Sequence, residues 1–530
     1  FQAEDGIRDV AVTGVQTCAL PIYKSFAPIL VAENLSWDDF ARLNLDLPYL
    51  PGVQPDVGDT RDYPFGDEMS HIVGYVAPVG PEDKPADKAQ SDALLDVPGF
   101  RIGKRGIEKS FDSEIRGKAG ASRVEVNAYG RAIRELGRDD GQPGESVYLT
   151  IDRELQAFAH EKLKEQSAGC VVLDAQNGDV LALVSTPGFD PSLFNVGITS
   201  EQWSALTGDL YKPLLNKALA GVYPPGSTFK TVTALAALDA GVITPDFTVS
   251  CSGVTFLGSH GFHCWRHEGH GRLDLHQGIK YSCDCYFYEV ARRVGIERLV
   301  ATARRLGFGA PTGLELPGER SGFLPSEAWK LKTIKEPWQL GETLIAGIGQ
   351  GYITASPLQL ATAIARIASG KKVSPRIVRV LGENAQPRPE IEPLDFAPEH
   401  LEAVRSGMNG VSNEPGGTAF GSRIVDENFA LAGKTGTAQV RRISTQERAS
   451  GIRRSQDMVW QLRDHALFIA FAPVSAPRYA IGMCVEHGNS GSGAAAPLAR
   501  DILLFAQKRG TLELPTSYPR STASAASQTL

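Results

Sequence analysis

The sequence lacks long apolar runs and lacks an excess of basic residues. None of its stretches approaches the roughly 18 consecutive apolar residues of a membrane-spanning helix. Its 54 Lys and Arg residues are outnumbered by 61 Asp and Glu residues, which gives a formal net charge of −7. A general nucleic-acid-binding protein would carry a basic patch or a high isoelectric point, so this class is disfavoured. We expect a globular protein of about two or three domains, because one core rarely organises a chain this long.

The first residues lack a recognisable pattern. Residues 1–22 begin with Phe, show neither helical nor strand periodicity, and lack the basic, apolar and small-residue regions of a signal peptide. We interpret residues 1–22 as a non-native or artefactual segment. Residues 510–530 are of low complexity, and we predict that they form a disordered tail.

The remaining chain divides into two parts by composition. Residues 23–144 are rich in Pro, Gly and charged residues and contain few long periodic runs, so we predict an elongated non-catalytic module. Gln142-Pro-Gly144 marks its end. Residues 145–509 form the second part, which opens with an amphipathic helix for which Asp152 is a plausible N-cap.

The second part begins and ends with strand patterns. The run CVVLDAQNGDVLALVS holds two apolar segments joined at Asn177-Gly178, which is a strong hairpin signal. Three later runs also resemble strands: Phe429–Val440, His465–Val474 and Arg478–Gly488. Mainly helical patterns separate the first two strands from the last three. We therefore predict an α+β fold in which helices flank one five-stranded antiparallel sheet.

An S-x-x-K motif stands at the start of a predicted apolar helix. In YPPGSTFK, a spacing of three residues puts Ser227 and Lys230 one helical turn apart on one face. The helix N-terminus places free N–H groups and a positive dipole end beside the serine oxygen. An uncharged lysine amine can accept the serine proton, as in other activated nucleophiles. The alternative is a capped helix with a surface lysine. A second match, Ser369 to Lys372, stands in a polar loop and is interpreted as a chance occurrence.

A K-T-G motif lies in one of the later predicted strands. Strand alternation puts Lys434 and Gly436 on one face and Thr435 and Thr437 on the other. Glycine would let a substrate backbone lie close along the strand. Thr435 could bind a carboxylate, and Lys434 could supply a positive field. The alternative is a strand with one exposed lysine.

A third motif, Ser282-Cys-Asp284, lies at a helix junction and is weak alone, because its plain interpretation is an N-cap pair. In the order S-x-x-K, S-x-[ND] and K-[ST]-G, however, the three motifs form the triad named for penicillin-binding proteins and serine β-lactamases. Longer matching runs are RDYPFGDEMSHIVGYVAPV, GKRGIEKSFDSEIRGKAG, VEVNAYGR, YPPGSTFK, GIGQGYITASPLQLA, KTGTAQV and LRDHALFIAFAP. Over nearly all of residues 23–488 the chain resembles the class B penicillin-binding proteins, in particular the elongation-type penicillin-binding protein 2 group.

The resemblance implies an architecture, ligands and partners. The expected architecture is a penicillin-binding, serine β-lactamase-like transpeptidase domain on an elongated pedestal module of the dimerisation type. An inner-membrane helix is expected ahead of residue 1, with the catalytic domain in the periplasm. The expected ligands are peptidoglycan stem peptides and β-lactams, with no cofactor for catalysis and no nucleic acid. The expected partners are a RodA-type glycosyltransferase and an MreC-type scaffold.

The resemblance also implies how the acyl-enzyme forms. Ser227 attacks the carbonyl between the two terminal D-alanines of a stem peptide, with Lys230 as general base. Backbone N–H groups of Ser227 and Thr437 form the oxyanion hole. An amine of a second stem peptide then completes the cross-link, whereas a β-lactam remains as a long-lived ester on Ser227.

The other motif residues take supporting roles by the same resemblance. Ser282 and Lys434 relay a proton to the departing D-alanine, whose carboxylate is held by Thr435 and Thr437. Asp284 positions local structure. The S-x-D motif replaces the S-x-N of many relatives and is compatible with the elongation-type branch.

Three other functions share parts of this pattern. A serine β-lactamase or β-lactam sensor has the same triad, but no E-x-x-L-N run follows the S-x-D motif here. A DD-carboxypeptidase would release the acyl group instead of transferring it, and the large N-terminal module favours the transferase. A catalytically inactive scaffold is disfavoured by the intact Ser227, Lys230 and Lys434.

Cysteine is scarce, with seven residues in the chain, which is too few for a disulfide scaffold at this size. A local group of thiols and imidazoles instead predicts a Cys3His zinc site formed by Cys251, Cys264, His270 and Cys285. His267 is a substitute for His270. The resemblance supports this prediction, because some elongation-type relatives carry a structural zinc beside the S-x-D motif. In this chain the ion would brace the loop that holds Ser282. A Cys251–Cys264 disulfide and free thiols are the alternatives.

Overall fold

The computed structural model describes residues 9–13, 30–51, 53–58, 60–84, 93–96, 99–118, 120–126, 132–386, 390–441, 447 and 454–510. The predicted tail beyond Gly510 lies outside these residues, as does most of segment 1–22. Within that segment Asp9–Thr13 forms strand β1, between β2 (Leu30–Leu35) and β3 (Gln54–Gly58). A local pattern did not indicate this strand, because its pairing partners lie farther along the chain.

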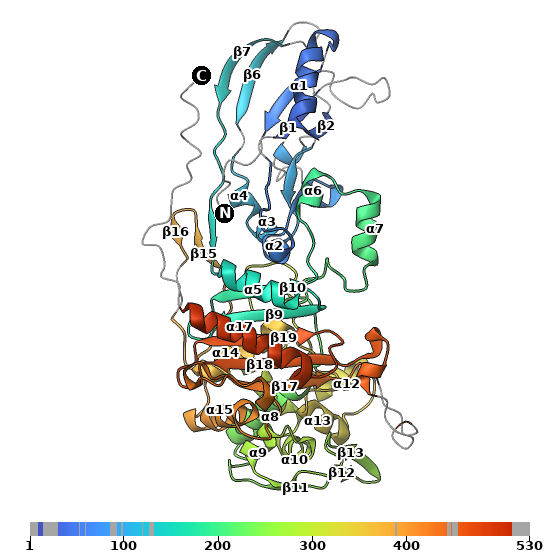
Figure 1. Cartoon of the computed structure of the whole chain (residues 1–530), viewed down its shortest axis with the longest axis vertical. Coiled ribbons are helices and arrows are strands. Elements are labelled where there is room, and N and C mark those ends of the chain that lie inside the picture. The colour runs from blue at the N-terminus through green and yellow to red at the C-terminus, as the bar shows by residue number, and fades with distance from the viewer. Residues whose placement is uncertain are drawn as a thin grey trace.

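The molecule is elongated, with the N-terminal module at one end and the main sheet toward the other (Figure 1). The module contains α1 (Trp37–Asp46) and a two-stranded ribbon of β6 (Ala121–Val126) and β7 (Ala132–Asp139). Helix α2 (Gly66–Val73) contacts the elements that follow residue 145. No helix in the described part of the chain is long and apolar enough to cross a lipid bilayer.

The main sheet has five antiparallel strands in the order β10-β9-β19-β18-β17. They are β9 (Ala168–Asp174), β10 (Val180–Thr186), β17 (Ala432–Ala438), β18 (His465–Ala472) and β19 (Tyr479–Val485). This confirms the predicted sheet, including the hairpin at Asn177-Gly178, where Gly178 has φ +81°. Strand β17, which carries the K-T-G motif, is at an edge, so one side of its backbone is unpaired within the sheet.

Helices cover both faces of this sheet. As a result, nearly every residue of β9, β18 and β19 is buried. Helix α14 (Pro357–Ser369) packs on β9 and β19. A Cβ added at Gly482 would lie 2.4 Å from Ala361 N, so this helix approaches the sheet at backbone distance. Helices α5 (Arg153–Leu163) and α17 (Ala496–Arg509) pack together, and α17 lies in front of the sheet in Figure 1.

A second group of helices packs around α8 (Lys230–Asp239), whose residues are buried from Lys230 to Leu238. A helix that is apolar on all sides is expected in such a core position. Helices α10 (Asp284–Val294) and α15 (Pro398–Asn413) contact α8, and α9 (Leu275–Lys280) leads into α10. The three sequence motifs therefore lie at the start of α8, at the α9–α10 turn and on the edge strand β17.

Candidate active site

Ser227 lies in a single 3-10 turn, Gly226–Phe229, that runs directly into α8. The turn is held from two sides, since Gly226 N donates to Gly349 O at 2.8 Å and Thr228 Oγ1 donates to Pro225 O at 2.7 Å. Ser227 itself is half-buried. Among the described residues its hydroxyl has no hydrogen-bond partner, so it is available to a ligand.

Lys230 is fully buried one turn after Ser227. Its Nζ donates to Asp284 Oδ1 at 2.7 Å and to the carbonyl oxygen of Ser282 at 2.8 Å, and lies 3.3 Å from Ser282 Oγ. The structure thus brings the S-x-x-K lysine onto the S-x-D motif. The backbone N–H of Lys230 donates to Ser227 O, but among the described residues no hydrogen bond joins the Lys230 amine to the Ser227 hydroxyl.

Lys434, on strand β17, also contacts Ser282. Its Nζ donates to Ser282 Oγ at 2.8 Å and to the carbonyl oxygen of Thr435 at 3.1 Å. Burial holds the pKa of Lys434 well below its usual value, and the positive charge of Lys230 lowers it further, whereas Asp284 opposes the shift. An uncharged amine is therefore favoured at Lys434, beside the hydroxyl of Ser282.

The S-x-D turn closes helix α9 in a left-handed conformation. Ser282 has φ +53°, a value that favours glycine. Ser282 N donates to Ile279 O at 3.1 Å and Cys283 N donates to Gly278 O at 3.0 Å, which is the Schellman pattern of a helix C-terminus. Cys283, not Asp284, caps the next helix, because its Sγ accepts from Tyr286 N. Asp284 is thus free to face Lys230, and the plain N-cap interpretation does not apply to it.

The K-T-G strand packs directly against the nucleophile turn. A Cβ at Gly436 would lie 2.8 Å from Thr228 Cγ2 and 3.0 Å from Pro225 O. The immediate reason for glycine here is therefore the close approach of the protein's own turn, not the approach of a substrate that the sequence suggested. Thr435 is nearly buried and Thr437 is half-buried on the other face of the strand.

Two residues outside the motifs also contact this strand. Thr418 Oγ1, in the loop after α15, lies 2.7 Å from Thr435 Oγ1. Gln350 Nε2 donates to Thr437 O at 3.0 Å. Sequence reasoning missed both roles, because each residue stands in a glycine-rich loop whose pattern carries no chemistry by itself. The GIGQG run around Gln350 supports the resemblance to the family but indicates no role for Gln350.

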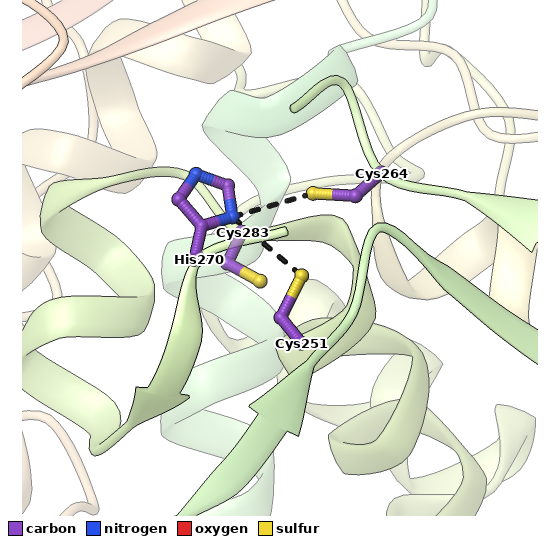
Figure 2. A group of neighbouring side chains, drawn as sticks. All are labelled: Cys251, Cys264, His270 and Cys283. Carbon is purple, nitrogen blue, oxygen red and sulfur yellow. Dashed lines mark hydrogen bonds between the residues drawn. The ribbon is translucent and has the colours of Figure 1, made fainter. Parts of the chain in front are cut away.

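The cysteine and histidine cluster lies beside the S-x-D turn (Figure 2). Its donor atoms lie within 4.8 Å of one another and belong to Cys251, Cys264, His270 and Cys283. His270 Nδ1 is 3.6 Å from Cys251 Sγ and 3.5 Å from Cys264 Sγ, and the buried Nε2 of His270 has no partner among the described residues.

The fourth member of this cluster differs from the prediction. The sequence predicts Cys285, but the thiol within the group is that of Cys283, the residue that caps α10. Hydrogen bonds from the Cys283 thiol, and next from the Cys285 thiol, strongly lower the pKa of Cys264. His267 is exposed. The six cysteines in the described residues are all free, so a Cys251–Cys264 disulfide is not present.

Comparison with known proteins gives matches over most of the chain. The penicillin binding protein transpeptidase domain matches residues 168–504, and the penicillin-binding protein dimerisation domain matches residues 5–149. The peptidoglycan D,D-transpeptidase MrdA of Escherichia coli K12 is 38% identical over 488 residues, which cover 90% of this chain and 76% of that protein. The MrdA protein of Haemophilus influenzae is 37% identical over 490 residues, which cover 90% of this chain and 74% of that protein.

Solved structures give the same picture. A complex between penicillin-binding protein 2 and MreC from Helicobacter pylori has a TM-score of 0.79 at 32% identity, covering 92% of this chain and 86% of the other. Penicillin-binding protein 2 of Pseudomonas aeruginosa in complex with WCK 5153 has a TM-score of 0.71 at 35% identity, covering 84% of this chain and 90% of the other.

Proposed function

Because this chain belongs to the family of penicillin-binding proteins with a transpeptidase domain, we propose that it cross-links peptidoglycan through an acyl-enzyme on Ser227. Its activity is that of a peptidoglycan D,D-transpeptidase that binds β-lactams. The observation that carries the acyl-enzyme proposal is that Lys230, one helical turn after Ser227, and Lys434 both contact the hydroxyl of Ser282. Three motifs far apart in sequence thus form one polar centre inside an apolar core.

Acylation begins when Ser227 Oγ attacks the carbonyl carbon between the two terminal D-alanines of a stem peptide. The oxyanion is held by the backbone N–H groups of Ser227 and Thr437, each worth a few kcal/mol. The orientation of Thr437 supports this role. Its carbonyl accepts from Gln350 at the free edge of β17, and the N–H and C=O of one strand residue point to the same side.

Proton transfer runs along a continuous chain of polar groups. Lys230, Ser282 and Lys434 are linked by contacts of 3.3 Å and 2.8 Å through Ser282 Oγ. The lowered pKa of Lys434 favours its uncharged amine, which can receive a proton from Lys230 through this hydroxyl. Lys230 then accepts the proton of Ser227, and the chain returns a proton to the amine of the departing D-alanine.

The substrate carboxylate is proposed to bind on the face of β17 that lies opposite Lys434 and Gly436. Thr435 and Thr437 project from the same face of the strand, and their hydroxyls can donate to a carboxylate. Thr418 lies 2.7 Å from Thr435 and can donate to it, which leaves the Thr435 proton directed at the ligand. After D-alanine departs, the amine of a second stem peptide attacks the ester, and the Ser227 hydroxyl is restored.

We propose a structural zinc ion at the cluster of Cys251, Cys264, His270 and Cys283. Tetrahedral zinc with sulfur at about 2.3 Å and nitrogen at about 2.0 Å places its ligand atoms about 3.5 to 3.8 Å apart. The two sulfur–nitrogen distances of 3.5 and 3.6 Å fit that geometry. When bound, the ion would cross-link β11 (Val249–Cys251), the loop after β13 (His260–His263) and the start of α10.

We also propose that the protein works with an MreC-type scaffold and a RodA-type glycosyltransferase, anchored at the inner membrane with its catalytic domain in the periplasm. Support comes from the related structures, one of which is a complex with MreC and another a peptidoglycan synthase complex. Co-purification of the protein with each partner from membranes tests this proposal. Failure to recover either partner would contradict it.

The acyl-enzyme is tested by intact-mass analysis after treatment with penicillin. The unsubstituted protein is expected to gain the mass of one penicillin, whereas Ser227→Ala is expected to gain none. Ser369→Ala, in the second S-x-x-K match, serves as the matched control and should label normally, because Ser369 Oγ is bound to Ala365 O at the end of α14. An adduct that persists in Ser227→Ala would contradict the proposal.

Product analysis distinguishes the transferase from a carboxypeptidase. With a D-Ala-D-Ala stem peptide and an acceptor amine, the transferase forms a dimeric product as well as free D-alanine. Release of D-alanine with no dimer under these conditions would favour the carboxypeptidase.

A further inference from the structure

The left-handed turn at Ser282 needs support from other residues. A non-glycine residue in this conformation costs about 1–2 kcal/mol, so neighbouring contacts must hold it. The turn cannot use glycine without losing the hydroxyl that Lys434 binds. It also exposes the Ser282 carbonyl to Lys230, which donates to it at 2.8 Å. Whatever supports this turn therefore also affects the position of Lys230.

Trp265 supplies that support from the loop that follows β13. Its indole Nε1 donates to the carbonyl oxygens of Tyr281 at 3.1 Å and Ser282 at 3.2 Å. Its backbone N–H donates to Asp284 Oδ2 at 2.9 Å. One residue thus binds three of the four positions from Tyr281 to Asp284, although it belongs to a different part of the chain.

Trp265 and Lys230 use complementary atoms of the same groups. Both donate to the carbonyl oxygen of Ser282, which has two lone pairs. Lys230 binds Oδ1 of Asp284 and Trp265 binds Oδ2. The orientation of the Asp284 carboxylate, and with it the site of Lys230 Nζ, is therefore set between these two residues.

Packing alone does not account for a tryptophan at this position. The side chain is 57% exposed, so much of its apolar surface is not removed from water. The indole has a single hydrogen-bond donor, Nε1, and this N–H is shared between two carbonyl oxygens. We infer that Trp265 is a positioning residue for the acylation step, because its two N–H groups hold Ser282 and Asp284 in the arrangement that fixes Lys230. This role rests on the proposed function of Ser227 and Lys230.

The sharpest test removes only the indole N–H. Replacing Trp265 with 3-benzothienylalanine keeps the bicyclic shape and substitutes sulfur for N–H. The same replacement at Trp203, an exposed tryptophan on α7 (Ser200–Gly208), is the matched control. Single-turnover acylation by a fluorescent penicillin yields three quantities for each protein: the acylation rate constant, the dissociation constant of the non-covalent complex, and the amplitude.

The replacement at Trp265 is expected to lower the acylation rate constant about tenfold, as for the loss of one well-placed hydrogen bond. The dissociation constant should stay within about twofold, because the ligand is proposed to bind on β17 and not on this turn. The amplitude reports the folded fraction, so it separates misfolding from a slower step. Trp265→Phe should reproduce the slower rate, and the Trp203 control should match the unsubstituted protein.

Two results would overturn the inference in distinguishable ways. An unchanged rate constant, or a change confined to the amplitude or the dissociation constant, would contradict the positioning role alone. Failure of the unsubstituted protein to form any adduct would overturn the proposed function and the role of Trp265 with it.

Discussion

Two lysine side chains and one carboxylate form the buried centre of this site. Lys230 is ion-paired with Asp284 at 2.7 Å, whereas Lys434 is fully buried and has only neutral oxygens as hydrogen-bond partners among the described residues. A second ammonium group in this interior would face both desolvation and repulsion from the first. The centre therefore gives the two amines different surroundings, with Lys230 ion-paired to Asp284 and the pKa of Lys434 lowered by burial, and this asymmetry allows a proton to move between them.

Replacement of Lys434 tests that asymmetry. Lys434→Arg places a permanent positive charge at this position, because a guanidinium does not lose its proton in proteins. Acylation by penicillin is expected to slow about a hundredfold or more, the usual size of a lost proton-transfer step. Lys434→Met removes the relay and should have a similar effect. Fluorescent-penicillin labelling measures both rates, with Lys372→Arg, at an exposed lysine after α14, as the control.

The same asymmetry predicts a pH dependence with a definite sign. The lowered pKa of Lys434 means that its uncharged form increases as pH rises through that value. The acylation rate of the unsubstituted protein should rise with pH over this range. A variant Lys434→Arg that acylates within about threefold of the unsubstituted protein would contradict the relay.

At the scale of elements, the start of α10 connects the cysteine and histidine cluster to the S-x-D turn. Cys283 stands between Ser282 and Asp284, caps α10 through its Sγ, and belongs to the donor cluster. Bound zinc would therefore fix the residue between the two that contact Lys230. This arrangement ties the geometry of the site to the cluster without any catalytic step at the metal.

A pair of neighbouring substitutions tests the composition of the cluster. Cys283→Ser should remove zinc binding while keeping the helix cap, because serine is a good N-cap residue. Cys285→Ser, two residues away, should retain zinc, since Cys285 lies outside the donor group. Metal analysis of protein purified without chelators, with melting temperature as a second readout, separates the two. Zinc bound by Cys283→Ser and lost from Cys285→Ser would instead support the ligand set expected from sequence.

At the scale of the whole molecule, the N-terminal module contacts the segment that leads to Ser227. His71 of α2 is half-buried, its carbonyl accepts from Asn216 Nδ2 at 3.2 Å, and Arg105 donates to Leu214 O at 3.0 Å. These contacts lie shortly before the YPPGSTFK motif. The position of the nucleophile segment is therefore connected to the module through α2 and α3 (Gly106–Ser110).

Acid is expected to weaken this junction through His71. Burial lowers the pKa of His71 to about 3, and the nearby cations Lys217 and Arg105 add to the shift, against hydrogen bonds with backbone at Pro213 and Pro187. As pH falls below about 6.5, the unfolded chain binds a proton that the folded chain does not, so stability decreases. Between pH 7.5 and pH 5 the loss should be about 2 kcal/mol.

His71→Gln removes this titration and should flatten the dependence of melting temperature on pH over the same range. His260→Gln, at an exposed histidine in β13, serves as the control and should behave like the unsubstituted protein. If His71→Gln loses as much stability in acid as the unsubstituted protein, the titration of His71 is not the cause.

The sequence by itself determined the features that depend on neighbouring residues. The hairpin at Asn177-Gly178, the cap of α5 at Asp152 and the five strands follow from local patterns of polarity and turn residues, and the structure confirms them. The order of the three motifs also indicated the family. These predictions succeed because periodicity and turn chemistry act over a few residues.

Only the tertiary structure decided which atoms meet. The choice of Cys283 over Cys285, the contact of Thr418 with Thr435 and the two N–H groups of Trp265 on the S-x-D turn all join distant segments. A local pattern cannot indicate them, because side-chain direction at a helix cap and the path of a loop depend on packing against residues far away in sequence. The motifs identify the residues of the site, and the packing of α8, α10 and β17 determines which of their atoms come into contact.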